Sequence, residues 1–182
     1  MEPNRVIHIW ERCRSQERQA QSELYHLFAP KMYAVCLRYA RDKDEANDIL
    51  QNGFIKVFSK CELYHGNGSL EGWIRRVIVN TAIEDLRKNK IKFLSTDDLP
   101  GNQIDYSSSS TLENLDYKDL LNLIKMLPMG YRTVFNLYAI EGYNHKEIAK
   151  MLEISEGSSK SQLSRARTWL KERIQKMEEL GI

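Results

Sequence analysis

The chain has 182 residues, of which 42% are hydrophobic and 29% charged, and its net charge is +2. This size suits one or two small globular domains and is short for a large enzyme core. The near-neutral total gives no general affinity for polyanions, so the distribution of charge along the chain is more informative than its sum. An acidic stretch runs from Asp42 to Asp48, and two basic segments run from Glu71 to Lys92 and from Glu156 to Lys176.

Signatures of membrane insertion, metal binding and catalysis are missing from the sequence. No apolar run approaches the roughly 20 residues that span a bilayer, so we predict no membrane insertion, no signal peptide and a cytoplasmic location. The three cysteines are far apart and form no CxxC pair, so we expect core thiols: Cys13, Cys36 and Cys61. The histidines show no HxxxH or HExxH spacing and no Walker-type loop is present, so we predict no metal, no cofactor and no catalytic residue.

Apolar residues recur at helical spacing in nearly every patterned segment, which predicts an all-α fold. The first such segment runs from Leu24 to Tyr39, and we expect a kink or a restart at Pro30, which cannot donate a backbone hydrogen bond. The clearest pattern runs from Ala46 to Phe58 and follows the i, i+3, i+4, i+7 series of an amphipathic helix. The polar face of this helix carries Glu45, Asp48, Gln51, Asn52 and Lys56.

A turn-forming segment from His65 to Ser69 follows, and Ser69 is suited to cap the next helix. That helix has an apolar face at helical spacing and a set of basic and amide side chains on its other faces. The side chains predicted to be buried are Leu70, Trp73, Ile74, Val77, Ile78 and Ala82. Those predicted to lie largely on the other faces are Arg75, Arg76, Asn80 and Arg87.

Helical periodicity fails between about Ile91 and Asn114, where proline, glycine, a serine run and several acids offer little apolar surface to offset the entropy of ordering. It returns with Leu120, stops at Pro128 and resumes afterwards. We therefore predict two small helical domains, over residues 1–90 and 115–182, joined by a flexible linker over residues 91–114.

The segment from Asn144 to Ser155 has the spacing of the first helix of a helix-turn-helix. Asn144 and Glu147 are placed as in a capping box, the small Ala149 allows a second helix to approach, and Glu153 occupies the tight-turn position where glycine is common. In the second helix the residues predicted to face inward are Leu163, Ala166 and Leu170, and those predicted to face outward are Lys160, Ser161, Ser164, Arg165 and Arg167.

A basic amphipathic helix by itself is more often a solvated surface helix than a DNA reader. Here the preceding helix, the turn and the small packing residue favour a DNA-binding helix over a surface helix. Short hydroxyl side chains and forked guanidinium groups near the start of the second helix are suited to reach base edges and phosphates. The pattern therefore favours a DNA-recognition helix.

Four segments, in this order along the chain, resemble bacterial RNA polymerase sigma factors of the extracytoplasmic-function group. They are residues 24–33 (LYHLFAPKMY), residues 44–54 (DEANDILQNGF), residues 73–77 (WIRRV) and the C-terminal helix-turn-helix. The resemblance extends over residues 20–174. It implies a dissociable, non-enzymatic subunit that directs promoter recognition and opening. The implied partners are the clamp and flap of the RNA polymerase core enzyme, promoter DNA and an anti-sigma factor.

The same resemblance assigns roles to the first domain. Asp48, Gln51 and Asn52 would make polar contacts with the coiled coil of the polymerase clamp, whereas Asp44 and Glu45 are equally explained as acids favoured at a helix start. Trp73 is expected to be a core residue rather than a surface on which a base stacks. The residues that would handle the minus-ten element as an opened strand are His65, Asn67, Arg75, Arg76, Asn80, Arg87 and Lys88.

The second domain would bind the minus-thirty-five element as a duplex, through the major groove. The residues expected at or near the bases are Lys160, Ser161, Ser164 and Arg165, and those expected on phosphates are Ser158 and Arg167. Ser159 and Gln162 stand where many family members have an aliphatic residue and an arginine, and these departures bear on the preferred promoter sequence. The nearest alternative is a stand-alone helix-turn-helix transcriptional regulator, which would need a dimer interface or an effector pocket in its first ninety residues.

Overall fold

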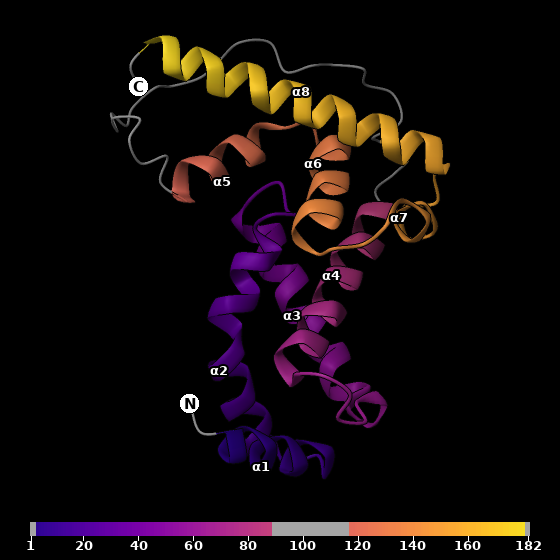
Figure 1. The fold of residues 1–182 in the computed structure, drawn as a ribbon. Helices are drawn as coiled ribbons and strands as arrows, with labels where there is room; N and C mark the ends of the chain where they lie inside the picture. The colour runs from indigo at the N-terminus through magenta and orange to yellow at the C-terminus, as the bar shows by residue number, and fades with distance from the viewer. Residues whose placement is uncertain (1–2, 89–116, 181–182) are drawn as a thin grey trace. The chain divides into compact units, whose positions relative to one another are not determined.

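The computed structural model describes residues 3–88 and 117–180, and over these residues the fold is built from helices (Figure 1). This confirms the all-α prediction. The chain divides into two compact units between residues 89 and 90. The flexible linker predicted over residues 91–114 lies outside the described residues.

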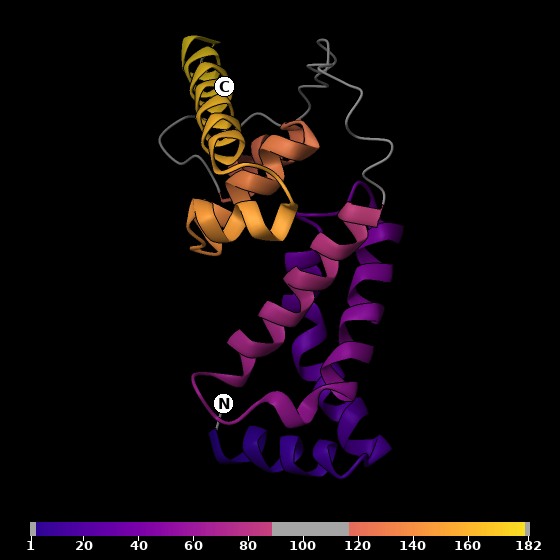
Figure 2. The ribbon, with the colours of Figure 1, turned by 90° about the vertical axis from the view of Figure 1, so that its right-hand side faces the viewer.

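The first unit is a bundle of three helices with a fourth helix across one end. The bundle consists of α2 (Arg18–Cys36), α3 (Lys43–Ser59) and α4 (Leu70–Lys88), each packed against the other two. Helix α1 (Pro3–Arg14) packs on α2 and lies across the end of the bundle, beside the short 3₁₀ helix η1 (Cys61–Leu63), as Figures 1 and 2 show.

Helix α2 continues through Pro30 as one element, so of the two outcomes predicted there the restart is wrong and the kink stays a prediction. Proline in a helix interior costs about 3 kcal/mol, because it removes a backbone hydrogen bond. Burial of a large apolar side chain contributes about 1.5–3 kcal/mol. Phe28 and Met32 are buried on either side of the exposed Pro30, so packing offsets the missing hydrogen bond.

The buried face of α4 is wider than predicted, because α4 packs against both α2 and α3. Ile74, Ile78 and Ala82 are buried as expected, and Val79, Thr81 and Ile83 are buried as well. Leu70, Trp73 and Val77 are only half-buried. The predicted amphipathic pattern of α3 is confirmed, and its buried residues are Ala46, Ile49, Leu50, Gly53, Phe54 and Val57.

The second unit packs three short helices and a π turn against one long helix. These elements are α5 (Tyr117–Met126), α6 (Met129–Phe135), the π turn η3 (Asn136–Ile140), α7 (His145–Leu152) and α8 (Glu156–Leu180). As predicted, the chain breaks at Pro128, which forms the N-cap of α6. Leu163, Ala166 and Leu170 of α8 are buried, which confirms the predicted inward face. None of the described helices is long and apolar enough to cross a membrane.

Candidate protein and nucleic-acid interfaces

The outer face of α3 is an exposed polar stripe. Asp42 caps the helix by accepting a hydrogen bond of 2.8 Å from the Glu45 backbone N–H. Beyond this cap, Asp48, Gln51 and Asn52 are all exposed. Because successive helical residues turn by about 100°, these three side chains fall on one face. The structure therefore brings together the three residues predicted to contact the polymerase.

Two features of this stripe go beyond the sequence pattern. Ile55 is 64% exposed and lies one turn after Gln51, in the middle of the polar residues. Its position outside the i, i+3, i+4 series of buried residues was the signal that could have identified it. Glu45 accepts hydrogen bonds from the backbone N–H (2.6 Å) and the Nε (3.1 Å) of Arg41, so this acid stabilises the start of the helix.

The segment from Tyr64 to Ser69 forms an exposed loop that leads into α4. Gly66 and Gly68 have φ angles of 80° and 83°, in the left-handed region that favours glycine. The Tyr64 hydroxyl donates a hydrogen bond of 2.8 Å to the Gly68 carbonyl, and the Ser69 hydroxyl accepts one of 3.1 Å from the Gly72 N–H, which confirms the predicted cap. His65 and Asn67 are both exposed on this loop.

Three of the residues predicted for the minus-ten element share one face of α4. Arg76, Asn80 and Arg87 are exposed and, at offsets of four and seven residues, fall on a single stripe. Arg75 is half-buried and lies about a third of a turn away, so it is not part of this stripe. Lys88 is exposed at the end of the helix, 3.7 Å from Asp85. The structure therefore separates Arg75 from the other basic residues of α4.

The helix-turn-helix has the local geometry that its sequence predicts. Asn144 Oδ1 accepts from the Glu147 backbone N–H at 3.0 Å, and Glu147 Oε2 accepts from the Asn144 backbone N–H at 2.8 Å, which completes the capping box. Glu153 ends α7 with a φ of 55°, so the position that usually holds glycine is left-handed here too. Ser155 then caps α8 by accepting a hydrogen bond of 3.0 Å from the Ser158 backbone N–H.

The first turns of α8 present a mixed basic and hydroxyl surface. Its exposed members are Lys160, Ser161, Ser164, Arg165 and Arg167. Several of them are held in place by neighbours. Lys160 lies 2.8 Å from Glu156 and lowers the pKa of that carboxyl, mainly by hydrogen bonding to it. The Arg165 guanidinium donates to the Tyr131 hydroxyl at 3.2 Å, and the Arg167 guanidinium lies 5.5 Å from the centre of the Tyr138 ring.

Ser158, a predicted phosphate contact, and the neighbouring Ser159 lie partly or wholly inside the unit. Ser158 is half-buried, and its hydroxyl accepts a hydrogen bond of 3.2 Å from Gln162. Ser159 is fully buried, and its hydroxyl lies 2.9 Å from His145 Nδ1. The His145 ring in turn stacks on Tyr138 with centroids 4.6 Å apart. The serine at position 159 therefore affects how α7 packs on α8, and its bearing on the preferred promoter sequence stays a prediction.

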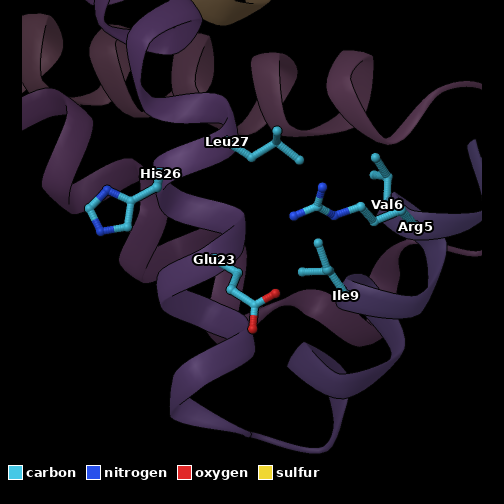
Figure 3. Close-up of a pocket in the computed structure, with 6 residues that line it drawn as sticks. All are labelled: Arg5, Val6, Ile9, Glu23, His26 and Leu27. Atoms are coloured by element: carbon cyan, nitrogen blue, oxygen red, sulfur yellow. The ribbon is translucent and has the colours of Figure 1, made fainter. Parts of the chain in front are cut away.

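No group of three or more His, Cys, Asp or Glu side chains in residues 3–88 and 117–180 is arranged to hold a metal. A shallow pocket of about 390 Å³ lies between α1 and α2, away from the residues discussed above (Figure 3). Its lining residues are Arg5, Val6, Ile9, Glu23, His26 and Leu27, and His26 points away from the other five.

Comparison with known proteins gives the same family for both units. Residues 24–91 match the Sigma-70 region 2 family, and residues 117–170 match the Sigma-70, region 4 family. The chain is 31% identical over 150 residues to the ECF RNA polymerase sigma factor SigM of Bacillus subtilis, covering 82% of this chain and 91% of the relative. It is 24% identical over 176 residues to the ECF RNA polymerase sigma-E factor of Haemophilus influenzae, covering 91% and 93%.

A solved structure shares the fold. It is the sigma factor RpoE of Bartonella quintana in complex with the anti-sigma factor NepR, with a TM-score of 0.50, 21% identity, and coverage of 85% of this chain and 96% of that one. Together these similarities favour a sigma factor over a stand-alone helix-turn-helix regulator. The chain belongs to the extracytoplasmic-function group of RNA polymerase sigma factors.

Proposed function

We propose that this sigma factor divides its work between the two helical units. The first unit, residues 1–90, binds the core polymerase and the minus-ten element, and the second, residues 115–182, binds the minus-thirty-five element. The observation that carries this proposal is the separation of exposed surfaces. An acidic and amide stripe lies on α3, a basic stripe lies on α4, and a basic and hydroxyl surface lies on the first turns of α8.

The α3 stripe is the proposed contact with the polymerase clamp. Asp48, Gln51 and Asn52 supply polar groups, and the exposed Ile55 supplies apolar area at the centre. A polar rim around a small apolar centre is the usual anatomy of a protein interface. The flap of the polymerase is the proposed contact of the second unit.

The loop between η1 and α4, together with the exposed stripe of α4, is the proposed minus-ten surface. Promoter opening needs a base taken out of its stack, at a cost of a few kcal/mol. His65, Asn67 and Asn80 offer donors and acceptors to the edge of such a base. Arg76 and Arg87 are placed to hold phosphates of the same strand. In this arrangement Lys88 adds charge at the end of the helix, and Arg75 acts on the phosphates from a separate face.

The first turns of α8 are the proposed reader of the minus-thirty-five duplex. Lys160, Ser161, Ser164 and Arg165 face the major groove, with Ser158 and Arg167 toward phosphates. A guanidinium that forms a bidentate contact with guanine contributes about 1–3 kcal/mol of discrimination. The contact between Arg165 and Tyr131 supports this role, because it orders the guanidinium before DNA arrives.

Sigma factors are transcription initiation factors rather than enzymes, and we propose that this chain likewise carries out no reaction of its own. RNA polymerase and promoter DNA lie in the bacterial cytoplasm, so we place the protein there. The Bartonella relative was solved with an anti-sigma factor. We propose that an anti-sigma factor also holds this chain, by covering the surfaces that meet the polymerase.

The polymerase assignment is tested by reversing one charge. Asp48→Arg should weaken association with core polymerase about tenfold, the loss that follows from about 1.4 kcal/mol at an interface. Glu62→Arg is the matched control, because it makes the same charge change at an exposed position in η1. Native gel titration of core enzyme measures both. If Asp48→Arg binds core polymerase as tightly as the unmodified protein, the assignment of the α3 stripe to the polymerase clamp is wrong.

The DNA assignment is tested with a pair of alanine substitutions. Lys160→Ala with Arg165→Ala should lower promoter-specific transcription at least about tenfold, and core binding should be unchanged. Lys171→Ala with Lys176→Ala removes the same charge from exposed positions later in α8 and serves as the control. If both pairs reduce run-off transcription equally, α8 contributes only general charge, and the proposed reading surface is wrong.

A further inference from the structure

Three aromatic rings from separate segments of the first unit form a closed cluster. The rings are Trp10 of α1, Tyr64 after η1 and Trp73 in the first turn of α4. The centroid of Trp10 lies 5.7 Å from that of Tyr64 and 5.5 Å from that of Trp73, and both contacts are edge-to-face. Tyr64 and Trp73 are themselves 5.7 Å apart. Such distances and angles are those that aromatic pairs prefer.

This cluster holds both ends of the loop proposed to take up the unstacked base. Tyr64 immediately precedes the loop, and Trp73 follows it by one helical turn. The Tyr64 hydroxyl also reaches across the loop to the Gly68 carbonyl, at 2.8 Å. Residues 65–69 are all exposed, so they have no buried side chain of their own to hold them. The conformation of the loop therefore depends on its anchored ends.

Trp10 is the member of the cluster that comes from outside the loop region. It is 5% exposed, and its Nε1 is buried with no hydrogen-bond partner among the described residues. What Trp10 contributes is therefore ring packing rather than a polar contact. Helix α1 contacts η1, which leads into the loop, and Gln16, two residues after the end of α1, lies 4.0 Å from the sulfur of Cys61 in η1.

We propose that Trp10 is a positioning residue for promoter opening, which holds the loop from His65 to Ser69 ready to capture the unstacked base. A loop that is already ordered loses less conformational entropy when it binds, so the capture step is favoured. The inference rests on the proposed role of this loop. It adds α1, which lies before the residues that match the Sigma-70 region 2 family, to the apparatus that opens DNA.

The test is the rate of promoter opening by the complete holoenzyme, followed by permanganate reactivity of a duplex promoter. Trp10→Leu should slow opening about tenfold, the ratio expected for the loss of two ring contacts. Trp10→Phe keeps a ring, loses no hydrogen bond and should stay within about twofold of the unmodified protein. Ile9→Val, a mild core change on the same helix, is the control and should leave opening unchanged.

A double-mutant cycle separates positioning from a general loss of stability. In a chain that carries His65→Ala and Asn67→Ala, the loop has lost its capturing groups. Trp10→Leu should then cause little further loss, because residues that act through each other are not additive. Tyr64→Leu provides a second route if Trp10→Leu folds poorly, because it removes the ring that Trp10 contacts at 5.7 Å and should also slow opening.

The possible failures are distinguishable. If the His65 and Asn67 variant opens promoters normally, the loop is not the capture site, and both the loop assignment and the role of Trp10 are wrong. If that variant is slow but Trp10→Leu adds its full effect on top, Trp10 acts elsewhere, and the positioning role alone is overturned. A core-polymerase affinity lowered by Trp10→Leu to the same extent as opening would also overturn it.

Discussion

Gly53 of α3 packs directly against Ile78 of α4, and replacing it tests how tightly these two helices are packed. A Cβ built at this position would lie 2.3 Å from Cδ1 of Ile78, and 3.6 Å from its Cα. Gly53 and Ile78 are both buried. Gly53→Ala therefore forces the end of the Ile78 side chain to move within a closed core.

The expected effect is the difference of two terms. Alanine is favoured over glycine in a helix interior by about 1 kcal/mol. Overpacking a filled core costs about 1–3 kcal/mol. We therefore expect Gly53→Ala to lower the free energy of unfolding by about 1 kcal/mol. Ile78→Val removes the clashing Cδ1 and, by itself, costs about 0.5–1.5 kcal/mol.

The double variant gives the sharpest result. With Cδ1 gone, the nearest remaining contact of the new Cβ is the position of Ile78 Cγ1, at an ordinary 3.4 Å. The gain in helix propensity is then recovered, so the double variant should be close to the unmodified protein in stability. The coupling energy between the two sites should be about 2 kcal/mol, which lies in the range measured for residues in contact.

Urea unfolding of the full chain, followed by tryptophan fluorescence, measures these differences. Two of the three tryptophans, Trp10 and Trp73, lie in the first unit, and the far-ultraviolet signal checks whether the units unfold together. Gly157→Ala is the control, because its Cβ would meet only the Ser155 hydroxyl, at 3.9 Å. The reasoning is refuted if Gly53→Ala stabilises as much as Gly157→Ala, or if it is additive with Ile78→Val.

Three further predictions concern charge, thiol reactivity and backbone strain. Lys56 lies 2.6 Å from Glu84 and holds the pKa of that carboxyl below its ordinary value of 4.5, mainly by hydrogen bonding to it. This pair therefore stabilises the fold fully above pH 4.5, and the stabilisation is lost as the pH falls through the pKa of the folded protein. Glu84→Gln should accordingly cost about 0.5 kcal/mol at neutral pH and progressively less as the pH falls below 4.5, measured by urea unfolding at each pH. Burial raises the pKa of Cys36 to about 12, so iodoacetamide should label this thiol at mildly alkaline pH only as fast as the chain unfolds, and rapid labelling of the folded protein would contradict this. Glu153 is held in a left-handed conformation that costs a non-glycine residue roughly 1–2 kcal/mol, and glycine removes this cost. Glycine also makes the unfolded chain more flexible, which costs about 0.4–1 kcal/mol of stability. Thermal unfolding of Glu153→Gly should therefore show a free energy of unfolding raised by about 0.5–1 kcal/mol.

The helix positions and most of the exposed faces were predictable from local patterns. The apolar series of α3, the capping box at Asn144 and the left-handed turn at Glu153 depend on residues within a few positions of one another. Such short-range rules also placed Asp48, Gln51 and Asn52 on an exposed face. The residues that face solvent on a helix follow directly from those that are apolar.

Helix α1 was not predicted, although its signal was present. Val6, Ile9, Trp10 and Cys13 follow the same i, i+3, i+4, i+7 series, but charged residues in every turn obscured it. The width of the buried face of α4 also could not be predicted from the sequence pattern. Thr81 and Ile83 are buried because two helices cover α4, and periodicity does not reveal how many neighbours a helix has.

The sequence by itself determined that the chain forms helices, where most of them begin and end, and to which family it belongs, because these depend on local spacing and on ordered motifs. Only the tertiary structure decided that Trp10 meets Tyr64 and Trp73, that Ser159 is buried against His145, and that Arg75 leaves the basic stripe of α4. The first two are contacts between separate helices, and the half-burial of Arg75 depends on how many helices cover α4. The register of such packing is set by the fit of whole helix faces, which no local pattern contains.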